Sequence, residues 1–275
     1  MILKAITRAV SRNISRCELT YKQREAADYE QAVRQHEAYC NFLVNQGVES
    51  IALEACDSQP DCCFVADTAV VLDELAVIAN MGAPARRDEI LPIERILSVH
   101  RQLARITPPA TLDGGDVVIL GKEIFVGHSR RTNRAGIEAF KRIVQPFGYK
   151  VTPVEVRGSL HLTTACSAID RETVLLNARW IDADVFARFW VLHVPEDEPW
   201  AASTLRVQDT LCVEAGAPRT LSLVARHCAQ VEALEISEFR KAEGSLSCLS
   251  ILFGEANPRQ IEQGINENKE VAHAE

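Results

Sequence analysis

The stretch LDGGDVVILGKEIFVG, residues 112–127, is the core of a unit that recurs along this chain. Two short apolar runs flank a turn at Gly121-Lys122, which predicts a β-hairpin. Thr132-Asn133 then predicts the cap of a helix that runs to about Phe147. Residues 149–156 return as an apolar, strand-like segment. The whole segment therefore predicts a strand-strand-helix-strand unit.

Similar patterns occur before and after this unit, although no repeat is visible residue by residue. Apolar spacing predicts helices over two segments and strands over several others. The predicted helices cover residues 27–47 and 87–105; the predicted strands cover residues 2–7, 50–53, 62–65, 68–72, 75–79 and 173–176, with a further unit over 219–236. Recurrence of the unit predicts an α/β protein built as a cyclic repeat.

Composition describes an ordinary globular chain of 275 residues, with 47% hydrophobic and 25% charged residues. A net charge of −8 argues against a nucleic acid or an acidic membrane surface as partner. No apolar run reaches the roughly 20 residues that span a bilayer. The nine cysteines form no CxxC pair and no regular spacing, which predicts reduced thiols, a cytoplasmic location and no zinc site.

The two ends of the chain carry separate predictions. Lys4, Arg8, Arg12 and Arg16 are spaced by four without an acidic residue among them, a pattern that a cleaved transit peptide would also have. The apolar character of residues 2–7 instead predicts a strand. At the other end, residues 255–275 contain few large apolar side chains and predict a flexible polar tail. Residues 1–254 are then one catalytic domain.

Three segments contain residues that could carry out chemistry together. Asp113 lies in Asp-Gly-Gly-Asp, His161 follows Gly-Ser-Leu, and Cys248 lies in Leu-Ser-Cys-Leu-Ser. A carboxylate can orient an imidazole, and an imidazole can transfer protons beside a nucleophilic thiol. Each residue also has a plain structural interpretation: a glycine turn, a hydrogen-bonded core histidine and a buried cysteine. Their combination indicates a thiol-based hydrolase.

Acidic residues and paired arginines suggest recognition of a charged ligand. Asp61 and Asp67 flank an apolar segment, where a carboxylate needs a cationic partner. Arg86-Arg87 and Arg130-Arg131 could grip a carboxylate, because guanidinium groups bind carboxylates through two hydrogen bonds. The alternative for the aspartates is an internal salt bridge with an arginine of this chain.

Taken in order, these motifs resemble the dimethylarginine dimethylaminohydrolase family, within the guanidine-modifying superfamily that includes arginine deiminase. The resemblance covers roughly residues 1–254. The segments that carry it are Phe64-Val65-Ala66-Asp67, Gly82-Ala83-Pro84-Ala85-Arg86-Arg87, Leu112-Asp113-Gly114-Gly115-Asp116, residues 125–133, Leu160-His161-Leu162 and Leu246-Ser247-Cys248. The resemblance implies a pentein fold, a five-bladed α/β propeller of ββαβ units with pseudo-fivefold symmetry.

The resemblance also implies a reaction and a set of roles. The enzyme would hydrolyse Nω-methylated arginine to citrulline and a methylamine through a covalent cysteine-thiouronium intermediate, without metal or organic cofactor. The catalytic residues would be Cys248, His161 and Asp113. The substrate-binding residues would be Asp67, Asp61, Arg86, Arg131 and Leu19, the last in a lid. The implied partner is a small guanidino molecule, and a homodimer is left open.

The sequence also departs from the family pattern. Ala66 stands where the family commonly has glutamate before Asp67, Thr163 stands where it has lysine, and Ser203-Thr204 replaces Asn-Cys. These differences leave two alternatives open. One is an arginine deiminase-like amidine hydrolase with another guanidino substrate, and the other is a weakened binder of guanidino ligands.

Overall fold

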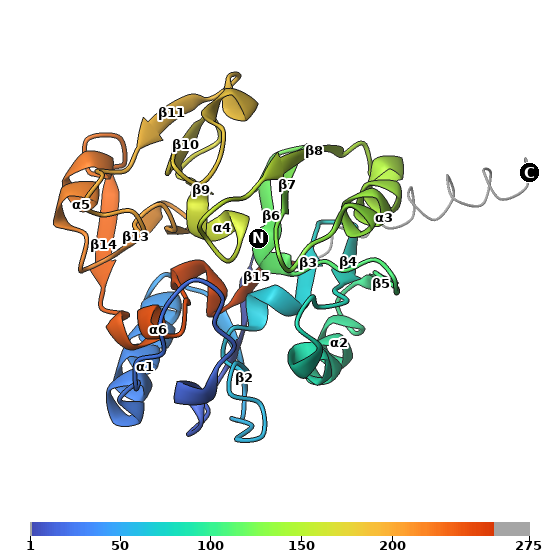
Figure 1. Ribbon diagram of the computed structural model, residues 1–275, viewed down its shortest axis with the longest axis horizontal. Helices are drawn as coiled ribbons and strands as arrows, with labels where there is room; N and C mark the ends of the chain where they lie inside the picture. The colour runs from blue at the N-terminus through green and yellow to red at the C-terminus, as the bar shows by residue number, and fades with distance from the viewer. Residues whose placement is uncertain (1, 256–275) are drawn as a thin grey trace, which may run out of the picture.

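The computed structural model describes residues 2–255, and within them fifteen strands form five three-stranded sheets. The sheets stand around a common centre, with helices on the outside (Figure 1). The predicted α/β class and five-bladed architecture are confirmed. The prediction for residues 256–275 lies outside the described residues.

Each sheet has the same internal order. An inner strand pairs antiparallel with a middle strand, which pairs parallel with an outer strand. The inner strands are β3 (Ala69–Val71), β6 (Val117–Leu120), β9 (Cys166–Ala168), β12 (Leu205–Val207) and β15 (Ile251–Gly254). The middle strands are β1 (Leu3–Arg8), β4 (Leu75–Ile78), β7 (Glu123–His128), β10 (Thr173–Leu176) and β13 (Thr210–Glu214). The outer strands are β2 (Glu49–Leu53), β5 (Gln102–Arg105), β8 (Lys150–Glu155), β11 (Trp190–His193) and β14 (Gln230–Leu234).

A helical segment connects each middle strand to its outer strand, as parallel pairing requires a crossover. These segments are α1 (Tyr29–Asn45), α2 (Ile90–Leu97), α3 (Arg134–Val144), η6 (Ala183–Phe186) and α5 (Pro218–Val224). Asn133 caps α3 by accepting a hydrogen bond from Gly136 N, as the sequence predicted. The remaining short helical segments are η1 (Ile14–Arg16), η2 (Val65–Thr68), η3 (Pro84–Glu89), η4 (Gly114–Asp116), η5 (Gln145–Phe147), α4 (Leu162–Ala165), α6 (Ser237–Lys241) and η7 (Leu246–Cys248).

The ring is closed by strands from both ends of the described chain. β15 pairs antiparallel with β1, and β1 pairs parallel with β2. The predicted N-terminal strand is therefore confirmed as the centre of this sheet. Assignment of residues 1–254 to one catalytic domain stays a prediction.

Two of the predicted elements are wrong. Residues 62–65 were expected as a strand, but residues 62–64 form a turn, Val65 begins η2, and the following strand starts only at Ala69. The helix expected over residues 87–105 ends at Leu97, and β5 follows. Local apolar periodicity could not separate a helix from a strand that pairs with a distant neighbour.

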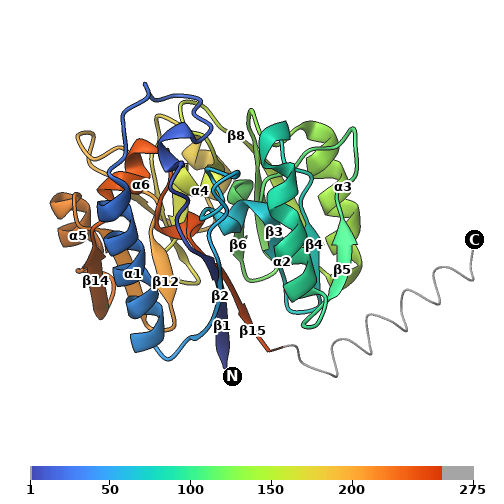
Figure 2. The same cartoon turned by 90° about the horizontal axis from the view of Figure 1, so that it is seen from below.

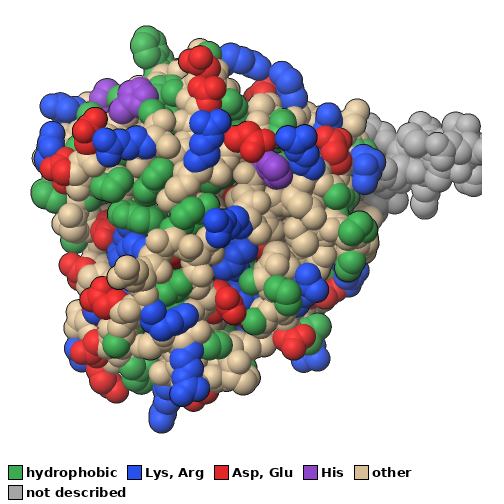
Figure 3. Space-filling view, in the orientation of Figure 1, with side chains coloured by type: hydrophobic (Ala, Val, Ile, Leu, Met, Phe, Trp, Pro, Cys, Tyr) green, Lys and Arg blue, Asp and Glu red, His purple; other side chains and the backbone are tan. Residues whose placement is uncertain are grey.

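Charged side chains of both signs are interspersed over the face seen in Figure 3, without a continuous basic area. No helix among the described residues has the length and apolar character needed to traverse a bilayer. Figure 2 shows that β1 begins near one face of the propeller, while α4 and α6 lie toward the opposite face.

Candidate active site

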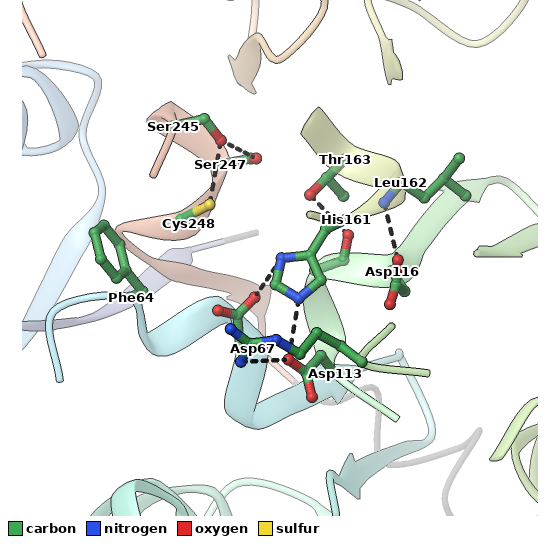
Figure 4. A network of polar contacts seen from close by, with 12 residues as sticks. Phe64, Asp67, Asp113, Asp116, His161, Leu162, Thr163, Ser245, Ser247 and Cys248 are labelled. Carbon is green, nitrogen blue, oxygen red and sulfur yellow. Dashed lines mark hydrogen bonds and ion pairs between the residues drawn. The ribbon is translucent and has the colours of Figure 1, made fainter. Parts of the chain in front are cut away.

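The candidate residues lie just before the inner strands, where four blades meet. Asp67 lies in η2 before β3, and Asp113 is the residue before η4 and β6. His161 precedes α4 and β9, while Cys248 ends η7 before β15. Because each of these residues lies in the segment that leads into an inner strand, all four come together at one site. Asp67 and Cys248, for example, are 181 positions apart in sequence (Figure 4).

Two glycines let these segments approach closely. A Cβ atom on Gly114 would lie 2.1 Å from the carbonyl oxygen of Ala66. A Cβ atom on Gly115 would lie 2.4 Å from Asp67 Oδ1 and 2.7 Å from His161 Nδ1. The two glycines of the Asp-Gly-Gly-Asp motif are thus required, because η4 packs closely against η2 and the imidazole of His161.

His161 is held between two carboxylates. Its Nε2 lies 3.0 Å from Asp113 Oδ2, and its Nδ1 lies 3.6 Å from Asp67 Oδ1 (Figure 4). The other oxygen of Asp113 accepts a hydrogen bond from Gly82 N at 2.8 Å. The ring orientation is therefore fixed, and Nδ1 is the nitrogen that faces Asp67.

A second aspartate of the motif supports the backbone beside His161. Asp116 Oδ1 accepts a hydrogen bond from Leu162 N at 2.9 Å, and Oδ2 accepts one from the Ser129 hydroxyl at 2.6 Å. Burial raises the pKa of Asp116 to about 6, although the positive charge of His161 opposes this shift. Asp116 thus holds the first residue of α4 and, through it, the position of the histidine.

Cys248 is 5% exposed and contacts a group of hydroxyls. Its sulfur lies 3.2 Å from Ser245 Oγ, which in turn contacts Ser203 Oγ and Ser247 Oγ at 2.8 and 3.2 Å. Burial, and then the negative charge of Asp67, raise the pKa of the Cys248 thiol to about 11. Figure 4 shows the sulfur on the side of the imidazole that carries Nδ1. The sequence did not single out Ser245, since its only signal was its position three residues before the cysteine.

Arg86, predicted to bind a ligand carboxylate, is paired with other residues of this chain. Its guanidinium donates to Asp67 Oδ2 at 2.7 Å, to Glu89 Oε2 at 2.9 Å and to the Phe64 carbonyl oxygen at 3.2 Å. The internal salt bridge, which was the alternative interpretation for Asp67, is therefore present. Because its guanidinium pairs with Asp67 and Glu89, Arg86 orients Asp67, and its predicted contact with a ligand carboxylate stays a prediction. Glu89, three residues along, was not foreseen.

Two polar atoms close to this group have no hydrogen-bond partner among residues 2–255. Asp67 Oδ1 is a carboxylate oxygen on a side chain 3% exposed, and Arg131 Nη1 is a guanidinium nitrogen on a side chain 7% exposed. The acidic oxygen closest to Arg131 Nη1 is Asp113 Oδ2, at 3.9 Å. Buried polar groups are rarely left unpaired, so both atoms indicate contact with a ligand.

A cavity of about 510 Å³ lies beside Arg131 and beneath the loop of residues 17–28. Leu19 lines it together with Arg130 and with residues of η3. Asp61 lies behind this loop and accepts hydrogen bonds from Glu18 N at 3.1 and 3.3 Å. Burial raises the pKa of Asp61. The structure thus places Leu19 and Arg131 on one cavity, while Asp61 supports the backbone next to Leu19.

Glu243 is a residue that sequence reasoning missed. Its carboxylate accepts hydrogen bonds from three consecutive backbone nitrogens, Thr20 N, Tyr21 N and Lys22 N, at 3.1, 2.6 and 2.5 Å. The residue is 2% exposed and has a φ of 58°, in the left-handed region that non-glycine residues rarely adopt. The only signal in the sequence was its place before Gly244. Glu243 fixes the loop of residues 17–28 above the site.

Asp67, Asp113 and His161 each offer one donor atom within 4.8 Å of the others, a spacing compatible with a metal ion. Arg86 already pairs with Asp67, and Asp113 accepts a hydrogen bond from His161 Nε2. A metal ion would therefore have to displace both contacts.

The pH dependence of folding stability tests this arrangement. Burial disfavours the imidazolium, but the negative charge of Asp67 and the hydrogen bond to Asp113 outweigh it and raise the pKa of His161 from 6.5 to about 9. The contribution of His161 to the free energy of unfolding is therefore fully present below pH 6.5 and is lost as the pH rises through 9. The difference of about 2.5 pH units corresponds to about 3 kcal/mol.

We expect urea unfolding to give a larger fall in the free energy of unfolding between pH 6.5 and 9 for the wild type than for His161→Asn. Comparing the two proteins cancels the contribution of Lys22, whose pKa burial lowers to about 8. Equal pH dependence in both proteins would contradict the proposed charge state of His161.

Comparisons with known proteins give a consistent result. The profile of a family described as N,N dimethylarginine dimethylhydrolase, eukaryotic, matches residues 6–193. The N(G),N(G)-dimethylarginine dimethylaminohydrolase of Streptomyces coelicolor is 35% identical over 250 residues, which are 90% of this chain and 96% of that protein. The protein of the same name from Pseudomonas aeruginosa is 31% identical over 230 residues, 82% of this chain and 90% of that protein.

Solved structures agree with the fold. A cysteine-to-serine variant of the Pseudomonas aeruginosa enzyme in complex with citrulline has a TM-score of 0.88 at 29% identity, covering 92% of this chain and all of that one. The N-terminal domain of ArgZ, an arginine dihydrolase from cyanobacteria, has a TM-score of 0.84 at 16% identity, with 93% of this chain and 99% of that chain covered, and shares the fold.

Proposed function

Because the chain belongs to the dimethylarginine dimethylaminohydrolase family, a family of hydrolases of guanidino C–N bonds, we propose that it hydrolyses Nω-methylated arginine to citrulline and a methylamine. One observation carries the proposal: two buried atoms of opposite charge at the site make no hydrogen bond to the described residues, and their nearest oppositely charged atoms lie 3.6 and 3.9 Å away. Asp67 Oδ1 matches a guanidinium, and Arg131 Nη1 matches an α-carboxylate. A guanidino amino acid satisfies both at once.

In the proposed complex the guanidinium lies against Asp67 and beside Cys248. The bound cation offsets the charge of Asp67, which is one of the two causes of the high thiol pKa. Substrate binding therefore favours the thiolate in a site where the empty protein holds the thiol. The α-carboxylate lies near Arg131 in the cavity beneath Leu19. Asp61 keeps the backbone next to Leu19 in place.

The reaction proceeds in two halves. The thiolate forms a bond to the guanidino carbon, and the C=N electron pair moves to nitrogen to give a tetrahedral adduct. His161, an imidazolium at neutral pH, donates its Nδ1 proton to the departing amine, whose C–N bond breaks to leave a thiouronium. Neutral His161 then takes a proton from a water molecule while the water oxygen attacks the same carbon. The C–S bond then breaks, which restores the thiolate, and the hydroxyl proton of the adduct passes to solvent as citrulline is released.

The direct test is to incubate the purified protein with asymmetric dimethylarginine and measure citrulline, with Ala66→Glu alongside. We expect turnover by the wild type and an increase in kcat/KM of about 10- to 100-fold in Ala66→Glu. A second carboxylate beside the guanidinium would add a charge-assisted hydrogen bond of about 1.5–3 kcal/mol. Turnover of arginine but not dimethylarginine would instead support the deiminase-like alternative, and no citrulline from either protein would contradict the proposal.

Glu243→Gln should loosen the loop of residues 17–28, because a neutral amide accepts hydrogen bonds more weakly than a carboxylate and offers one oxygen instead of two. We expect KM for dimethylarginine to rise about tenfold with a smaller change in kcat, which follows from a loss of about 1–2 kcal/mol in loop closure. Limited trypsin cleavage after Lys22 should accelerate in parallel. The exposed Glu25→Gln, on the same loop, is the matched control and should change neither quantity. Unchanged cleavage in Glu243→Gln would rule out the anchoring role.

A further inference from the structure

A cavity of about 200 Å³ lies on the far side of Cys248 from the loop of residues 17–28. We call it the inner cavity. Its lining contains no charged side chain: it consists of Ala66, Ala69, Val70, Val71, Gly114, Gly115, Val117, Ile119, Thr163, Ser247, Cys248, Ser250, Ile251 and Leu252. Most of these side chains are aliphatic. The space next to the nucleophile is therefore suited to an uncharged, apolar group.

A second cavity of about 1240 Å³, the outer cavity, adjoins the inner cavity. Five residues line both of them: Val117, Ile119, Thr163, Ser247 and Leu252. The outer cavity extends to the opposite ends of the inner strands, where Gly121 and Gln208 follow β6 and β12, and to Leu3 at the start of β1. This is the face of the propeller where β1 begins in Figure 2. The axis is thus hollow behind the site.

The exposure of Ile119 is explained by the two cavities that it lines. It lies on inner strand β6, yet its side chain is 39% exposed, whereas its neighbours Val118 and Leu120 are 5% and 7% exposed. Alternate residues of a strand point to opposite sides. Ile119 lines both cavities, whereas Val118 and Leu120 pack in a hydrophobic cluster and line only the outer cavity. A change at Ile119 therefore alters the cavities with little effect on packing.

The orientation of the proposed substrate directs one part of it into the inner cavity. Its α-carboxylate lies at Arg131, on the cavity beneath Leu19, and its guanidino carbon lies at Cys248. A substituent on the terminal nitrogen continues in the same direction and passes Ala66 and Thr163. Both are small residues at positions where the family pattern has glutamate and lysine.

We propose that the inner cavity is the subsite for the Nω-substituent, and that this protein hydrolyses arginines whose uncharged Nω-alkyl group is longer than methyl. This inference rests on the proposed function. The bonds formed and broken are the same: water supplies the oxygen of citrulline, and the longer alkylamine leaves with the proton from His161. Burial of each added methylene favours binding by about fourfold where the cavity accommodates it.

The first experiment measures kcat/KM of the wild type for Nω-methyl-, Nω-propyl- and Nω-pentyl-L-arginine, all of which give citrulline. We expect kcat/KM for the propyl compound to equal or exceed that for the methyl compound. Values for both longer compounds more than 100-fold below the methyl value would overturn the inference, while leaving the proposed function intact.

Matched variants at Ile119 locate the effect. Ile119→Phe should fill the inner cavity beside this residue and lower the ratio of propyl to methyl kcat/KM at least tenfold, while Ile119→Ala should enlarge the cavity and raise the ratio. Thermal unfolding of both variants shows whether they fold as the wild type does. The same ratio in all three proteins would overturn the subsite, and Ile119→Ala keeps the test valid if Ile119→Phe does not fold.

Binding to Cys248→Ser, measured by calorimetry, separates the inference from the proposed function. Equal or tighter binding of Nω-propyl- than Nω-methyl-L-arginine supports the subsite, even if the wild type turns over neither compound. Turnover of the methyl compound with at least tenfold weaker binding of the propyl compound overturns the subsite alone. No binding and no turnover of either compound overturns both.

Discussion

Cys248→Ser should abolish citrulline formation from dimethylarginine, with kcat reduced by at least about four orders of magnitude. A serine hydroxyl has no thiolate form near neutral pH, and the proposed reaction requires an anionic nucleophile that forms a bond to carbon. The fold should remain, since oxygen replaces sulfur at a position already surrounded by the hydroxyls of Ser245, Ser247 and Ser203. Steady-state citrulline assays and far-UV circular dichroism of both proteins provide the measurement.

Cys228→Ser is the matched control, because Cys228 is a half-buried free thiol packed near α5 and β14, away from the site. It should keep wild-type kcat. A haloacetamidine probe, which carries an amidinium next to its electrophilic carbon, should label the wild type at Cys248 and not at the other eight cysteines. Residual activity of Cys248→Ser above about a thousandth of the wild type would refute the covalent mechanism.

His161→Asn should lower kcat/KM by about 10³-fold, within the range of general acid–base catalysis. The pH profile separates this role from a structural one. The reactive form of the free protein contains a thiolate and an imidazolium, whereas the pKa values of about 11 for Cys248 and about 9 for His161 make thiol and imidazolium the main form at neutral pH. The wild-type kcat/KM should therefore rise with pH up to about 9 and then level off.

In His161→Asn the plateau should disappear, since no imidazolium remains to lose its proton, and kcat/KM should keep rising toward pH 11. Asp113→Asn provides the positioning control. Loss of the carboxylate removes the hydrogen bond to Nε2 and lowers the pKa of His161, so the bend in the profile should move below pH 9. An unchanged bend in Asp113→Asn, or a plateau retained in His161→Asn, would show that another group provides the proton.

Much of the architecture followed from local patterns. Apolar runs separated by Gly121-Lys122, with the Asn133 cap after them, predicted one blade correctly, and recurrence of that pattern indicated a ring. The failures were local as well. Residues 62–65 are apolar but form a turn and the start of η2. The residues of β5 were predicted as part of the preceding helix. Short apolar segments form strands only when a neighbour is available to pair, and such pairing is a tertiary contact.

For the site, the sequence by itself determined which chemical groups are available: one motif with two aspartates and two glycines, a histidine, a late cysteine and paired arginines. Motif order was enough to indicate the family. The structure shows why the motifs are spread along the chain: Asp113, His161 and Cys248 each precede a different inner strand. The predicted roles of Cys248, His161 and Asp113 stay predictions until the variants are measured.

Only the tertiary structure decided how the charges are paired. Arg86 follows Asp67 by 19 positions and was expected to bind the ligand, yet it is paired with Asp67 and Glu89, which leaves Arg131 with the unpartnered nitrogen. Glu243 holds a loop more than 200 residues away in sequence. The cavity beside Ala66 forms only where inner strands β3, β6 and β15 come together. A sequence lists donors and acceptors, but burial and distance determine which of them satisfy one another and which remain for a ligand.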